Sequence, residues 1–137
     1  MTYRNIIIKG DPLHKEAALK ASNDITPGMA CQKDASGIFP STANQTNLQV
    51  AIEFGNDGRG VTDVYAEDGE QVRYVAPRKG DELALLIGTS QTLAVGAELA
   101  IKAGGTFIAA ASNPAVARVL EAVTTTAGTQ LARCEVI

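Results

Sequence analysis

The chain has 137 residues and a net charge of −3 at pH 7, and 45% of its residues are hydrophobic while 20% are charged. This length and composition are typical of one folded domain with one core, and they exclude a disordered chain. The twelve basic residues are scattered and no run of about 18 apolar residues could cross a membrane, so we expect no nucleic-acid partner, no membrane anchor and no signal peptide.

The first nine residues form an apolar segment of β-branched and aromatic character. No neighbouring segment offers a strand to pair with, so we expect an extended arm that docks elsewhere. Its candidate contact residues are Tyr3, Ile6, Ile7 and Ile8. A Gly10-Asp11-Pro12 break follows, and two interpretations stay open for residues 12–21: a short helix with Asp11 as its N-cap, or an ordered, non-helical continuation of the arm.

Turn residues and alternating apolar residues predict strands through the middle of the chain. Thr26-Pro27-Gly28 predicts a type II turn, because proline presets φ at the second position and glycine permits a positive φ at the third. A strand over residues 29–32 should follow, and then a polar loop over residues 37–47. Residues 48–54 alternate strictly between apolar and polar side chains, which is the clearest strand signal in the chain.

Glycine-rich turns separate the next strands. Predicted turns lie at residues 55–60, 67–70 and 78–81, with extended segments at 61–67, 72–77 and 82–87. A glycine turn, a polar residue and a leucine recur in that order at residues 79–83 and 95–99, and more loosely at 26–29. Short strands between glycine turns indicate an all-β domain.

The C-terminal third continues this pattern. Residues 97–102 and 106–111 predict a hairpin, and Gly104-Gly105 between them suits a primed turn. Residues 115–124 fit either a helix or a strand, and the all-β context favours the strand. Residues 131–137 alternate again and predict a last strand.

Several residues could carry chemistry, and each has a simpler interpretation. The single histidine, His14, lies in the expected arm, and Cys31 and Cys134 are far apart, which favours two reduced thiols. The glycines at 55, 58 and 60 lack the spacing of a phosphate loop. The spacing of five neighbouring carboxylates does not match the fixed ligand positions of a calcium-binding loop; they are Asp57, Asp63, Glu67, Asp68 and Glu70. We therefore predict no catalytic residue, cofactor or metal site, and a non-enzymatic domain that binds other protein subunits.

An ordered set of motifs resembles the small decoration, or cement, proteins of tailed-bacteriophage capsids. The set covers most of the chain: a Lys-Gly-Asp arm followed by residues 24–28, then 56–65, 72–74, 77–83, 96–99 and 117–122. The alanine-rich stretch at 109–111 and the threonines at 124–126 depart from the pattern of that family.

The resemblance implies a small β-tulip or β-clip domain over residues 25–137 with an extended N-terminal arm over residues 1–24. It also implies a homotrimer on the outer capsid surface that ties neighbouring major capsid subunits together. The expected location is therefore the virion, after synthesis in the cytoplasm of the host bacterium. Tyr3, Ile6, Ile7 and Ile8 would be the arm's capsid contacts, by addition of a strand to a neighbouring sheet.

Two other functions stay open. A carbohydrate-binding or adhesive module on the virion surface is the alternative, although the chain has only six aromatic side chains for stacking on sugars. An interfacial nucleotide hydrolase of β-clip type would need Asp57, Asp63 or Asp81 to hold a metal, and no motif supports that role.

Overall fold

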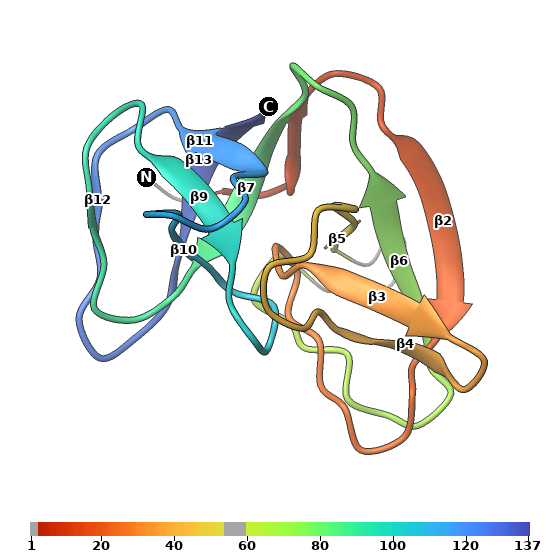
Figure 1. Ribbon diagram of the computed structural model, residues 1–137. Coiled ribbons are helices and arrows are strands. Elements are labelled where there is room, and N and C mark those ends of the chain that lie inside the picture. The colour runs from red at the N-terminus through yellow and green to blue at the C-terminus, as the bar shows by residue number, and fades with distance from the viewer. Residues whose placement is uncertain (1–2, 54–59) are drawn as a thin grey trace.

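The described part of the computed structural model, residues 3–53 and 60–137, is entirely β-structure and loops, with no helix. Figure 1 shows two lobes side by side, one formed mainly by the C-terminal half of the chain and one by strands β2 to β6. The all-β prediction is confirmed. The strands are β1 (Ile7–Lys9), β2 (Leu13–Ala18), β3 (Cys31–Asp34), β4 (Gly37–Pro40), β5 (Val50–Ala51), β6 (Gln71–Ala76), β7 (Glu82–Ile87), β8 (Thr92–Leu93), β9 (Glu98–Ile101), β10 (Phe107–Ala109), β11 (Ala117–Val119), β12 (Val123–Thr124) and β13 (Gln130–Val136).

The first lobe is a small closed barrel. Its strands run in the order β7-β10-β9-β11-β13, and β13 pairs again with β7, which closes the ring. The β7–β10 pair is parallel and the other pairs of the ring are antiparallel. Closure removes most free edges, and the interior is filled by fully buried apolar side chains that include Phe107, Leu85 and Leu99.

The second lobe consists of a three-stranded antiparallel sheet, β2-β6-β5, and the β3–β4 hairpin. A separate apolar cluster lies between them and contains Ile25, Ile38, Tyr65 and Val72. The Tyr65 hydroxyl donates a hydrogen bond of 2.7 Å to the carbonyl oxygen of Ile52, which satisfies a polar group inside this cluster.

The Thr26-Pro27-Gly28 turn joins the two lobes. The Met29 amide donates to the Thr26 carbonyl at 3.1 Å and Gly28 has a φ of +94°, as the predicted type II turn requires. The Gly28 amide donates to Ala51 in β5, and its carbonyl accepts from Leu86 in β7. One turn thereby connects the sheet of the second lobe to the barrel.

The recurring glycine turns also fold as predicted. Gly80 and Gly96 have φ values of +95° and +91°, and each turn leads directly into a buried strand, β7 or β9. The turn before β7 is reinforced by Asp81, whose carboxylate accepts a hydrogen bond of 2.8 Å from the Arg78 amide. The same short sequence pattern therefore marks the start of two strands.

Of the two interpretations of residues 12–21, the non-helical one holds: they contain the strand β2, of which six residues pair with β6. Four local predictions need correction. The predicted polar loop over residues 37–47 begins with the strand β4, which pairs with β3. The segment 61–67 forms turns and a single bridge, between Tyr65 and Ile25, and no strand. The Gly104-Gly105 hairpin has no two-residue primed turn: the Gly105 amide donates to Lys102, so the turn spans residues 102–105. Residues 48–52 bury the predicted apolar face, yet only Val50–Ala51 form a strand, and residue 54 lies outside the described residues.

The ambiguous segment 115–124 contains the short strands β11 and β12, in agreement with the strand interpretation. β11 closes the barrel between β9 and β13, while β12 pairs with β8 in a ribbon that extends beyond the barrel in Figure 1.

Candidate binding surfaces

The N-terminal segment lies against the chain's own barrel. Strand β1 pairs with β7, and Ile6, which is 0% exposed, belongs to the barrel core. The Ile6 carbonyl accepts a hydrogen bond of 2.7 Å from the Ala84 amide. Ile6 therefore has no side-chain surface to offer a partner, whereas Ile7 and Ile8 are half-buried and retain some.

Tyr3 is also half-buried, and its hydroxyl donates a hydrogen bond of 2.7 Å to the carboxylate of Glu121. Burial, and then this hydrogen bond to a carboxylate, raise the pKa of Tyr3 to about 12. Tyr3 borders a shallow hollow of about 450 Å³ that Val64 and Leu131 also line. Of the four predicted arm residues, three thus lie at least partly on the surface and one is in the core.

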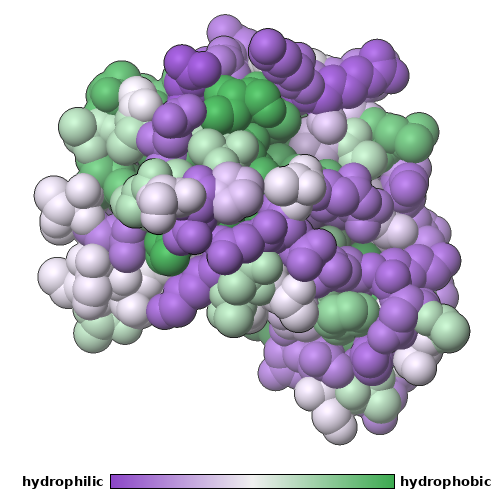
Figure 2. All heavy atoms as spheres, in the orientation of Figure 1, coloured by the Kyte–Doolittle hydropathy of each residue, from purple (hydrophilic) through white to green (hydrophobic). Residues whose placement is uncertain are grey.

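β2 is the outer strand of the second lobe, and its first four residues are exposed. It ends the order β2-β6-β5, and Figure 1 shows it on the outside of the molecule. Leu13, His14, Lys15 and Glu16 are all exposed, and the large apolar side chain of Leu13 is 58% exposed. Figure 2 shows that polar residues cover most of the visible face, with hydrophobic residues in small patches.

The direction of the β2 backbone groups follows from two hydrogen bonds. The Leu19 amide donates to Glu70, which continues the pairing with β6, whereas the Lys20 amide donates to Ile38 on the opposite side. Backbone groups alternate along an antiparallel strand, so those of His14 and Glu16 point away from β6. Within residues 3–53 and 60–137, no strand pairs with this edge between Leu13 and Glu16.

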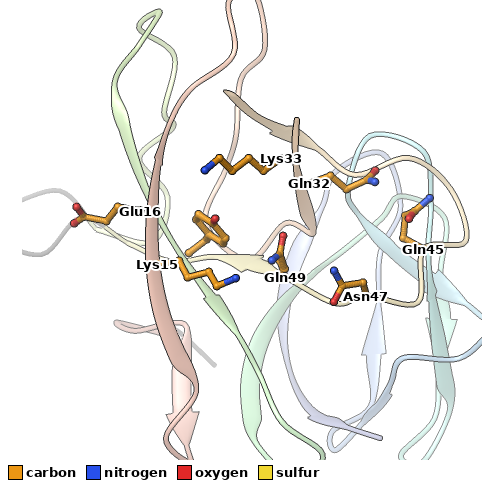
Figure 3. A pocket seen from close by; sticks show the side chains of 8 residues that line it. Lys15, Glu16, Gln32, Lys33, Gln45, Asn47 and Gln49 are labelled. Carbon is orange, nitrogen blue, oxygen red and sulfur yellow. The ribbon is translucent and has the colours of Figure 1, made fainter. Parts of the chain in front are cut away.

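Next to this edge lies a polar hollow of about 580 Å³ (Figure 3). Its residues come from β2, β6, β3 and the loop before β5: Lys15, Glu16, Gln32, Lys33, Gln45, Asn47, Gln49 and Tyr74. We call it the amide–lysine pocket. Figure 3 shows Lys15 directed toward the other side chains and Glu16 directed away from them. This difference reflects the alternation of side chains along β2.

The amide–lysine pocket has a positive character. Lys15 and Lys33 form no ion pair with any residue of the described chain, while the nearby Lys20 is bound to Asp34 at 2.8 Å. Gln32 has its oxygen occupied by Thr42, whose amide donates to it at 2.7 Å. Tyr74 is only 3% exposed, and burial raises its pKa, so its hydroxyl stays neutral in the usual pH range.

Two of the candidate metal-binding carboxylates, Asp63 and Asp81, have structural partners within turns. Asp81 is buried in its turn, and Asp63 accepts a hydrogen bond of 2.6 Å from the Gly60 amide. His14 is exposed on β2, and Asp57 lies outside the described residues. In residues 3–53 and 60–137, no three His, Cys, Asp or Glu side chains are grouped so that they could hold a metal. No helix of this part of the chain could span a membrane.

Cys31 and Cys134 are both free and buried, as expected for two separate thiols. Burial raises the pKa of each thiol to about 12. Cys31 belongs to the core of the second lobe and Cys134 to the barrel, so each acts as a small apolar side chain.

The pattern of the sequence did not reveal the β2 edge or the amide–lysine pocket. The pocket residues come from four separate segments between residues 15 and 74, and only the fold brings them together.

In comparisons with known proteins, the sequence matches no protein-family model and no curated protein.

Proposed function

We propose that this chain is a capsid decoration protein that binds the outer surface of a tailed-phage head and links neighbouring major capsid subunits. The sequence motifs that resemble this family support the proposal. Two of these motifs lie where parts of the fold are connected. Residues 24–28 include the turn that connects the lobes, and residues 77–83 lead into the barrel strand β7.

The single observation that carries the proposal is the free edge of β2. The backbone groups of His14 and Glu16 point outward, and the side chains around them are exposed. An extended segment of a partner could add to this edge as a further strand, with main-chain hydrogen bonds providing affinity. The proposed contact therefore moves from Ile6, which is buried, to the strand that follows Pro12.

A decoration protein strengthens a shell because it binds the assembled lattice and not the separated subunits. Any ligand that binds only one state stabilises that state by mass action. We expect a homotrimer on the capsid, in which the half-buried Tyr3, Ile7 and Ile8 contact a neighbour. Each of its subunits would then add the same stabilisation of the lattice around a symmetry axis.

Cosedimentation with expanded, undecorated phage heads tests the proposal. The wild-type protein should bind with a fixed stoichiometry and raise the temperature at which the heads break. His14→Pro removes the outward amide without removing a hydrogen bond to β6, so it should weaken binding while the domain stays folded. His14→Ala is the matched control, because it changes the same side chain and keeps the amide.

Absence of saturable binding by the wild-type protein to any expanded head would refute the decoration function. Equal binding by His14→Pro and His14→Ala, with both variants folded by circular dichroism, would refute the role of the β2 edge alone. The two parts of the proposal are therefore tested separately.

A further inference from the structure

The amide–lysine pocket extends the β2 edge into a site with its own chemistry. Lys15 lies on β2 itself, and its side chain points into the pocket, while the backbone groups of His14 and Glu16 on either side point outward. A strand added to β2 would place every second side chain on the Lys15 face of the sheet. Those side chains would lie beside the pocket.

The pocket offers positive charge and polar groups. Lys33 stands on β3, across the pocket from β2, and neither it nor Lys15 is neutralised by a carboxylate within the described residues. Gln45, Asn47 and Gln49 add amide groups along the loop before β5. Two lysines facing one concave polar surface favour a negatively charged ligand, in a chain whose overall charge is −3.

We propose that the amide–lysine pocket binds carboxylate side chains of an extended, acidic peptide segment from the protein partner that pairs with β2. This inference rests on the proposed function and adds the chemistry of the partner. A carboxylate opposite Lys15 would lie about 5 Å away across the strands, and a second one two residues along the partner, about 7 Å further, would reach toward Lys33. The side-chain amides of Gln45, Asn47 and Gln49 would bind backbone and polar groups of the peptide that lie between its two carboxylates.

A peptide fits the pocket better than an acidic saccharide. Sugar sites use an exposed aromatic face for stacking, and the one aromatic ring here, Tyr74, is 3% exposed. The adjacent free backbone edge is a feature that a peptide can use through a ladder of hydrogen bonds and a saccharide cannot. The free edge of β2 beside the pocket and the burial of the Tyr74 ring therefore both favour a peptide ligand.

The test measures peptide binding to the full chain, without phage heads. The probe is a fluorescent seven-residue peptide, Thr-Glu-Val-Glu-Val-Glu-Thr, and its comparison is the same peptide with glutamine in place of glutamate. Fluorescence anisotropy at low salt should show that the glutamate peptide binds about tenfold more tightly or better, because charge-assisted contacts are the stronger ones. Raising the salt should reduce this difference.

Variants assign the binding to the pocket. Lys15→Glu combined with Lys33→Glu should abolish the preference for the glutamate peptide. Lys102→Glu is the matched control, since Lys102 is exposed, lies in the β9–β10 turn and does not line the pocket. His14→Pro should weaken both peptides, because it removes a backbone donor that both would use.

Two results would overturn the inference. One is equal binding of the glutamate and glutamine peptides to the wild-type protein. The other is binding of an oligogalacturonate that is tighter than that of the glutamate peptide and is lost in the Lys15 and Lys33 double variant, which would make the pocket a saccharide site. A failure of the wild-type protein to bind phage heads, with peptide binding intact, would instead refute the decoration function and leave the pocket's chemistry standing.

Discussion

Replacement of Gly28 by alanine tests how the two lobes are held together. Gly28 has a φ of +94°, and a Cβ atom there would lie 2.6 Å from Cδ2 of Leu131 and 3.2 Å from the Ala84 carbonyl oxygen. The left-handed backbone costs a non-glycine residue about 1–2 kcal/mol, and overpacking costs about 1–3 kcal/mol more. Gly28→Ala should therefore lower the free energy of unfolding by about 2–5 kcal/mol.

Gly96→Ala is the matched control. Gly96 occupies the same position of a similar turn, with a φ of +91°, but a Cβ atom there meets nothing within 4 Å. This variant should lose only the backbone contribution of about 1–2 kcal/mol. Urea unfolding followed by circular dichroism measures both values. Equal losses in the two variants would refute the view that close packing between the turn and the barrel holds the lobes together.

Three further predictions concern buried or half-buried side chains. Tyr65→Phe should lower the free energy of unfolding by about 1–3 kcal/mol in urea, since it leaves the buried carbonyl of Ile52 without its donor; an unchanged midpoint would contradict this. Cys31 and Cys134, with pKa values of about 12, should react with a thiol reagent at pH 8 only after denaturation, and rapid labelling of the native protein would contradict their burial. Tyr3 and Tyr65 also have pKa values of about 12, above the ordinary value of 10. The tyrosinate absorbance of these two residues in the folded protein should therefore rise only near pH 12, and the free energy of unfolding should fall as the pH rises from about 10 to 12. A titration of both side chains near pH 10 in the folded state would contradict this.

Much of the fold could be predicted because its signals are local. Gly28, Gly80 and Gly96 each have a positive φ, and all the apolar residues of β7 and β9, the strands after Gly80 and Gly96, are buried. The strand at 82–87 was predicted with its observed boundaries, since its apolar residues are buried on both faces in the barrel. These features depend on residues a few positions apart, which a single sequence displays directly.

The parts that were missed depend on contacts between distant segments. The sequence left residues 12–21 open between a helix and a non-helical segment, and pairing with β6, some 60 residues away, makes them a strand. The burial of Ile6 likewise depends on β7. The amide–lysine pocket requires four segments to meet, so no spacing in the sequence marks it. Long-range strand pairing decided each of these outcomes.

The most direct test of the account is a cryo-electron microscopy map of expanded phage heads saturated with this protein. The account predicts density for the domain on the outer surface, with a strand of the major capsid subunit or of its neighbour continuing the sheet beyond His14 and Glu16. A map in which the domain binds the head through another face, with the β2 edge open to solvent, would contradict it.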